Sequence, residues 1–252
     1  MTDRSLGSVF ADPEVAQAYR QRAPYAKETF DILEHLLVDP RTVLDLGAGS
    51  GALAREMIRF ADRVDAVDPS AAMIDEGRRL PNGTDPKLHW IHAAAEDADL
   101  TGPYGLATAG TSIHWLDAAR VMPRLATALA PQGKLAIVEM DEGEHPMPAL
   151  IDVFRRYSDA HHREATEIVS ELVAAGQFVR EGERRTGPVV VRRSIDEYLQ
   201  LLHSSSGYAR VQLGDRAAAF ENDVRDVFAR AGADSIERSY VTVVTWGRPV
   251  AR

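Results

Sequence analysis

Three glycines, Gly47, Gly49 and Gly51, follow a short apolar run in the segment VLDLGAGSGA and precede a helical pattern. Glycines between a strand and a helix let backbone N–H groups approach a ligand closely, at the positive end of the helix dipole. Asp68 ends the next apolar segment, where a carboxylate would accept hydrogen bonds from ribose hydroxyls. The glycines and this acid together predict a binding site for a nucleotide-type ligand.

Two ligands fit this pattern. The dinucleotide fingerprint G-x-G-x-x-G/A is formally satisfied by Gly47, Gly49 and Ala52. S-adenosylmethionine is favoured by Asp45, because a carboxylate would repel a pyrophosphate beside it but suits an ammonium group or an ordered water near a methionine amine. The third glycine of the loop also stands at position 51 rather than 52. The loop and Asp68 by themselves leave both ligands open.

His114 is the candidate general base among the eight histidines. It follows an expected strand, at the carboxyl edge where ligands bind in parallel sheets, and a neutral imidazole is the natural base near pH 7. The alternative is that His114 and Trp115 only pack and orient the chain. His161, His162 and Glu164 are not expected to bind a metal ion, since neighbouring residues on a helix point apart.

The elements that must position these residues alternate between strands and helices over residues 42–140. This alternation predicts an α/β fold with a parallel, doubly wound sheet. Pro131-Gln132-Gly133 predicts a tight turn before the fifth strand. The expected strands are 42–46, 63–67, 88–93, 104–109 and 134–139, and the expected helices are 12–22, 27–38, 70–79 and 117–129.

Beyond residue 140 the pattern changes. We expect a long helical region at 147–180, a strand at 188–191, helices at 194–203 and 215–231, and a last strand at 240–246. The resulting division has N-terminal helices covering the cofactor (1–40), a Rossmann-like nucleotide-binding core (41–146), and a helical cap with the last two strands (147–252).

Composition limits the partners. The net charge of -9 argues against a nucleic-acid partner, and the absence of cysteine excludes disulfides and a thiolate nucleophile. The N-terminal residues contain no apolar signal segment, and no apolar run is long enough to span a membrane. We therefore expect a cytoplasmic monomer or homodimer that binds a small molecule, neither nucleic acid nor membrane.

Several motifs in chain order resemble the class I (Rossmann-like) S-adenosylmethionine-dependent methyltransferases, in the small-molecule group that includes the trans-aconitate methyltransferases. Near the N-terminus Tyr19 and RAPY (22–25) resemble the Y…RPxYP signature of this group, with alanine at 23 and 26 in place of the usual prolines. The further matching segments are VLDLGAGSG (43–51), VDAVDPSAAMI (64–74), TSIHWLD (111–117), LAPQGKLAIVE (129–139) and TWGR (245–248).

The resemblance implies a mostly parallel seven-stranded sheet with an antiparallel last strand and a helical cap. It implies S-adenosyl-L-methionine as the cofactor. The implied activity is methyl transfer (EC 2.1.1.-) to an O, N, S or C atom of a small molecule, such as a specialised metabolite or a carboxylic acid. Three alternatives stay open: non-methyl chemistry on the same cofactor, such as intramolecular cyclisation; a nicotinamide-dependent oxidoreductase; and a cofactor-binding regulator.

Carried over residue by residue, the resemblance predicts the site. Where the family often has an aspartate for the adenine amino group, this chain has Ala94, so Glu96, Asp97 or the backbone at Ala95 would replace that contact. The predicted catalytic residue is His114, and no metal ligand is expected. The predicted cofactor-binding residues are Tyr19, Arg22, Asp45, Gly47, Ala48, Gly49, Gly51, Asp68, Pro69, Met73, Ala95, Glu96, Gly110 and Thr111. The predicted substrate-binding residues are Tyr25, Trp115, Tyr198 and His203.

Overall fold

The computed structural model describes residues 8–158 and 165–251 of the chain. Contacts between Cα atoms divide the chain into two compact units, which are described separately. The sheet unit comprises Tyr25–Met140, Arg163–Gly187 and Val241–Arg252, and the helical unit comprises Met1–Pro24, Asp141–His162 and Pro188–Tyr240.

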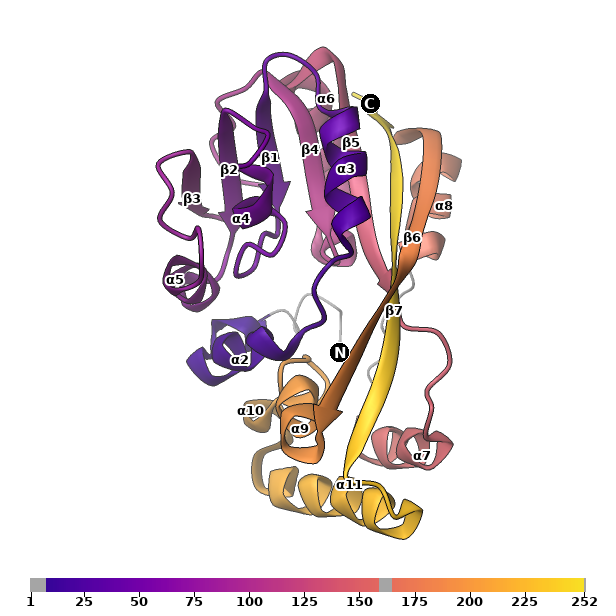
Figure 1. Cartoon of the computed structure of the whole chain (residues 1–252). Helices are drawn as coiled ribbons and strands as arrows, with labels where there is room; N and C mark the ends of the chain where they lie inside the picture. The colour runs from indigo at the N-terminus through magenta and orange to yellow at the C-terminus, as the bar shows by residue number, and fades with distance from the viewer. Residues whose placement is uncertain (1–7, 159–164, 252) are drawn as a thin grey trace. The chain divides into compact units, whose positions relative to one another are not determined.

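The sheet has seven strands in the order β3-β2-β1-β4-β5-β7-β6 (Figure 1). The first five strands pair in parallel, and the last strands are antiparallel, which confirms the predicted class I methyltransferase topology. Parallel pairing brings the carboxyl ends of β1, β2 and β4 to one edge. The strands are β1 (Thr42–Leu46), β2 (Arg63–Asp68), β3 (Leu88–His92), β4 (Tyr104–Gly110), β5 (Leu129–Asp141), β6 (Phe178–Ser194) and β7 (Ser235–Pro249).

Helices bury both faces of this sheet. Strand β1 is apolar at successive positions because its side chains alternate between two cores: Val43 belongs to one and Leu44 to the other. Helices α3 (Lys27–Leu36) and α4 (Ala54–Met57) pack into the first core, and α6 (Ala118–Ala128) and α8 (Ala165–Ala174) into the second. Helices α5 (Ala71–Arg79) and η3 (Ile113–Trp115) follow the carboxyl ends of β2 and β4.

The tight turn predicted at 131–133 is wrong, because these residues lie inside β5. Leu129 already pairs with Tyr104, and Lys134 pairs with Leu106, so the intervening residues of β5 form a bulge opposite a single residue of β4. Gly133 permits it, since a Cβ at this position would lie 2.7 Å from the carbonyl oxygen of Tyr104. The Pro-Gln-Gly signal therefore marks an irregularity within a strand.

The helical region predicted at 147–180 is too long at its C-terminal end. Helix α7 (Pro148–Tyr157) and helix α8 lie within it, but Phe178 begins strand β6. Gly176 ends α8 with a φ of +68°, and Gln177 N–H donates to the carbonyl of Leu172 at 2.9 Å. The buried side chain of Phe178 then packs in a core of the sheet, so tertiary packing overrides the helical pattern.

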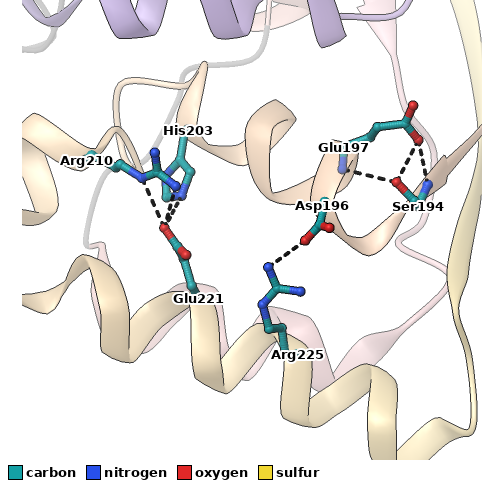
Figure 2. A network of polar contacts seen from close by, with 7 residues as sticks. All are labelled: Ser194, Asp196, Glu197, His203, Arg210, Glu221 and Arg225. Atoms are coloured by element: carbon teal, nitrogen blue, oxygen red, sulfur yellow. Dashed lines mark hydrogen bonds and ion pairs between the residues drawn. The ribbon is translucent and has the colours of Figure 1, made fainter.

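The helical unit has its own core. Apolar side chains of α7, α9 (Ile195–His203) and α11 (Ala217–Ala231) pack together, with Phe220 fully buried. Figure 2 shows the polar contacts between α9, α10 (Arg210–Leu213) and α11: Asp196 pairs with Arg225, and Glu221 with Arg210 and His203. A capping box between Ser194 and Glu197 begins α9. The short elements are η1 (Ser8–Ala11), α2 (Pro13–Ala18), η2 (Tyr19–Gln21) and η4 (Gly214–Arg216).

Because Leu106 lies in the middle of the sheet, its truncation should strongly lower the stability of the protein. This side chain is 0% exposed in β4, between Val43 of β1 and Lys134 of β5. We expect Leu106→Ala to lower the free energy of unfolding by about 2–5 kcal/mol, because a buried cavity is left behind. Urea denaturation measures it. The control Val190→Ala truncates a side chain that is 57% exposed on β6. An equally large loss of unfolding free energy in the control would contradict the role of Leu106 as a core residue.

Candidate functional site

The glycine loop leaves β1 at the carboxyl edge of the sheet. Gly47, Gly49 and Gly51 all have positive φ angles, of +63°, +57° and +77°. Gly47 is also in close contact with Ser112: a Cβ at position 47 would lie 2.6 Å from the Cβ of Ser112, whose hydroxyl donates to the carbonyl of Leu46 at 2.7 Å. The loop therefore lies directly against the segment that follows β4, and only glycine fits there.

Asp68 connects this loop to β2. Its Oδ2 accepts a hydrogen bond from the N–H of Gly49 at 2.7 Å, and its Oδ1 accepts one from the N–H of Ser70 at 2.8 Å. The side chain is largely buried, and desolvation raises the pKa of Asp68, while both backbone hydrogen bonds lower it. The carboxylate thus lies at the end of β2 beside the loop, at the position predicted for ribose recognition.

Asp45 lies in β1, where it pairs with Thr108 of the neighbouring strand β4. It is 2% exposed, and the hydroxyl of Thr108 donates to its Oδ1 at 2.7 Å. Desolvation raises the pKa of Asp45 to about 7, hydrogen bonds from Thr108 and from the backbone of Ala54 lower it, and the charge of Asp68 raises it. Thr108 and the backbone of Ala54 are its partners within the protein, and its role toward the methionine end of the cofactor stays a prediction.

The carboxyl end of β4 brings together Gly110, Thr111 and Tyr25. The Tyr25 hydroxyl lies 3.2 Å from Oγ1 of Thr111, and a Cβ at Gly110 would lie 2.8 Å from the same hydroxyl. Thr111 has a φ of +49°, and its N–H donates to the carbonyl of Val138 at 2.8 Å. A β-branched residue in this left-handed conformation is strained, and such strain is characteristic of ligand sites.

His114 and Trp115 follow directly in η3, both half-buried. Their ring centroids are 4.6 Å apart and the planes are tilted by 52°. The pair therefore lies at the same sheet edge as the glycine loop, although the ring contact also serves packing.

The predicted adenine-side residues lie beyond Asp68. Met73 is buried in α5, and a Cβ at Gly49 would lie 3.1 Å from its Cε, so Met73 packs against the loop. Pro69 is exposed and Ala95 buried. Glu96 accepts a hydrogen bond from the N–H of Asp117 at 2.7 Å, at the start of α6, so one of its oxygens already has a structural role. Which group replaces the contact missing at Ala94 stays a prediction.

Four predicted residues belong to the helical unit. Arg22 donates from Nε to the hydroxyl of Ser204 at 2.9 Å, and its guanidinium lies 5.1 Å from the ring centroid of Tyr19. The Tyr198 hydroxyl lies 2.8 Å from Nε2 of His145. Both ring nitrogens of His203 face acceptors, the Tyr208 carbonyl and Glu221, so a substrate contact by His203 would have to break one of these bonds. The ligand roles of these four residues remain predictions.

The described residues were compared with the patterns of a metal site and of a membrane-spanning helix. No group of three or more His, Asp or Glu side chains in residues 8–158 and 165–251 is arranged to hold a metal ion. His161, His162 and Glu164 lie outside the described residues. No helix in the described part of the chain has the length and apolarity needed to cross a bilayer.

Sequence reasoning missed three residues that shape the site: Thr108, Ser112 and Trp90. Thr108 and Ser112 hold Asp45 and Leu46 from β4 and the segment after it, and the indole of Trp90 in β3 lies against Gly51. Each contact joins residues that are far apart in the sequence, and no local motif signals such a contact.

Comparisons with known proteins agree with this geometry. Residues 43–133 match the model of a methyltransferase domain. An uncharacterized methyltransferase of Mycobacterium tuberculosis is 34% identical over 120 residues, 47% of each chain. The trans-aconitate 2-methyltransferase of Methylobacterium nodulans is 31% identical over 150 residues, 56% of this chain and 55% of that one. The chain thus spans about half the length of the curated relatives it matches.

The fold has a close counterpart among solved structures. A structure from Anaeromyxobacter dehalogenans, named as a candidate type II methyltransferase, superposes with a TM-score of 0.65 at 23% identity, over 90% of this chain and 97% of that one. The matched domain includes the glycine loop, Asp68 and the end of β4. The domain match and the relatives identify residues 43–133 as a class I (Rossmann-like) S-adenosylmethionine-dependent methyltransferase domain.

Proposed function

We propose that this chain is a methyltransferase that moves the methyl group of S-adenosylmethionine to a small molecule. The observation that carries the proposal is the glycine loop held beside Asp68 at the carboxyl ends of β1 and β2. This arrangement offers backbone N–H groups and a carboxylate to one ligand. As parts of the same proposal, the enzyme is cytoplasmic and acts as a monomer or homodimer.

The residues present fit this cofactor. The glycines leave the ligand side of the loop without side chains, and Asp68 retains lone pairs for ribose hydroxyls beyond the two that accept backbone N–H groups. Asp45 supplies a buried acid below the loop, which favours a cationic ligand. When bound, S-adenosylmethionine supplies a methyl group already activated by its sulfonium charge. The remaining roles proposed are the amino-acid end for Gly110 and Thr111, and the adenine for Pro69, Met73, Ala95 and Glu96.

The protein's own contribution would be to position the acceptor and remove one proton when the acceptor atom is an OH or NH group. We assign the removal of this proton to His114, because His114 lies just beyond β4 at the carboxyl edge of the sheet. Tyr25 and Trp115, at the same edge, would contact the acceptor.

Isothermal titration calorimetry separates this proposal from the nicotinamide alternative. We expect the wild-type protein to bind S-adenosylmethionine and S-adenosylhomocysteine but not NADH. Binding of NADH without binding of S-adenosylhomocysteine would overturn the proposal. A screen of acceptors for release of S-adenosylhomocysteine then tests methyl transfer, and release of 5′-methylthioadenosine in its place would indicate non-methyl chemistry.

Removing the Asp68 carboxylate should weaken cofactor binding. We expect Asp68→Ala to cost about 1.5–3 kcal/mol of binding free energy for S-adenosylhomocysteine, the range for hydrogen bonds to a charged group. Calorimetry measures the change. Asp75→Ala is the matched control, because Asp75 is an exposed acid in the following helix. Unchanged affinity in Asp68→Ala would refute the ribose assignment.

Asp45 should make the stability of the ligand-free protein pH-dependent. Its folded-state pKa of about 7 exceeds its ordinary value of 3.8, so the folded protein binds an extra proton between these values. The stabilisation from the protonated carboxyl is therefore complete below about pH 4 and is lost as the pH rises through about 7.

Asp45→Asn mimics the protonated acid and tests this slope. We expect the variant to become more stable than the wild type by a few kcal/mol on going from pH 4 to pH 8, as measured by urea denaturation. The exposed-site control Asp75→Asn should run parallel to the wild type. A constant difference between Asp45→Asn and the wild type across this range would show that Asp45 titrates normally.

Replacing His114 tests the proposed base. Once an acceptor is found, we expect His114→Ala to lower kcat by about 10²–10⁴-fold, the usual contribution of a general base, and to leave the Kd for S-adenosylhomocysteine unchanged. His35→Ala, at an exposed histidine of α3, is the control. An unaffected kcat would leave His114 only its packing role.

A further inference from the structure

The indole of Trp90 packs against the glycine loop at Gly51. A Cβ at Gly51 would lie 2.6 Å from Cη2 of this ring, and a Cβ at Gly77 would lie 2.5 Å from the same atom. Because both positions are glycine, the edge of the ring fits between the loop and helix α5. Gly51, expected from sequence to contact the ligand, thus also makes room for a supporting side chain.

A hydrogen bond fixes the position of this ring. Nε1 of Trp90 donates to the carbonyl of Gly83 at 2.8 Å. Gly83 is buried and belongs to the turn Pro81-Asn82-Gly83 that follows α5. The ring is therefore anchored at its polar end by a backbone carbonyl and touches the glycine loop at its apolar end.

Arg55 joins the same turn to the loop by a second route. Its Nε donates to the carbonyl of Ser50 at 2.9 Å, and its Nη1 donates to the carbonyl of Pro81 at 2.9 Å. The side chain of Asn82 donates in return to the carbonyl of Arg55 at 3.2 Å. Two independent contacts, one apolar and one charged, thus connect the 81–83 turn with the loop backbone.

Glycines in left-handed conformations need such support. Each glycine loses more conformational entropy on ordering than any other residue, and the loop has three of them at alternate positions. The hydrogen bond from Gly49 to Asp68 restrains the middle of the loop, and Arg55 and Trp90 restrain its end at Ser50 and Gly51.

We propose that Trp90 is a positioning residue for the cofactor: together with Arg55 and the 81–83 turn, it holds loop 47–51 in the conformation that binds S-adenosylmethionine. This inference rests on the proposed function of the loop. It assigns an effect on cofactor affinity to a side chain whose contacts in the structure are with Gly51, Gly77 and Gly83.

Trp90→Phe tests the proposal, with Trp246→Phe as a matched control. Both tryptophans are partly buried against the same hydrophobic core, and both rings pack on a glycine; a Cβ at Gly182 would lie 2.3 Å from Cζ2 of Trp246. We expect Trp90→Phe to raise the Kd for S-adenosylhomocysteine about tenfold, equivalent to one lost hydrogen bond. Hydrogen–deuterium exchange of the ligand-free protein should quicken over residues 45–56. Trp246→Phe should change neither quantity, whatever its effect on stability.

Gly77→Ala provides a second variant with an intact indole. The added Cβ would meet Cη2 of Trp90 and, at 2.8 Å, the carbonyl of Ser50. Alanine favours helix more than glycine, so α5 itself is not weakened. We expect about tenfold weaker binding of S-adenosylhomocysteine and faster exchange over residues 45–56.

Equal changes of Kd in Trp90→Phe and Trp246→Phe, or wild-type affinity in both Trp90→Phe and Gly77→Ala, would overturn the positioning role. A wild-type protein that binds neither S-adenosylmethionine nor S-adenosylhomocysteine would overturn the proposed function itself. The two failures are therefore distinguishable from the same set of titrations.

Discussion

The carboxylate of Asp68 is the interaction on which the site depends. It accepts the N–H of Gly49 from the loop and the N–H of Ser70 from the start of α5, so one side chain connects the loop, β2 and the helix that follows. A glycine-rich loop has few side chains of its own with which to hold a conformation. Loop geometry is therefore set by partners outside the loop: Asp68 at Gly49, Arg55 at Ser50 and Trp90 at Gly51.

Two buried acids in one site oppose the stability of the ligand-free protein. Desolvation raises the pKa of both Asp45 and Asp68, and their mutual repulsion raises that of Asp45 further. Hydrogen bonds from Thr108 and from backbone N–H groups offset only part of this cost. A cationic ligand would offset more, which gives a physical reason for retaining unfavourable buried carboxyl groups at a site proposed for a sulfonium cofactor.

Much of the sheet could be predicted from local pattern. The strand at 42–46 has the predicted bounds, and β2, β3 and β4 differ from the prediction by one residue at the carboxyl end. Apolar residues make up half or more of each of these short strands, and Gly, Pro or Asp stands near their ends, which are short-range signals. The prediction failed at 131–133 and at Phe178. At 131–133, pairing of β5 with β4 turns the expected turn into a bulge within the strand. At Phe178, packing in the sheet makes a segment with a helical pattern the start of β6. Both are long-range effects.

The sequence by itself determined the chemistry available at the site: the glycine loop, the acids at 45 and 68, and the order of strands that brings them to one edge. Only the tertiary structure decided how deeply these groups are buried and which residues they contact. Asp45 is buried against Thr108, and one oxygen of Glu96 accepts a hydrogen bond at the start of α6. Tyr25 lies against Thr111, and Trp90 packs against Gly51 of the loop. The physical reason is that burial, pKa and loop conformation depend on contacts between residues distant in sequence, whereas motifs and periodicity report only on neighbours.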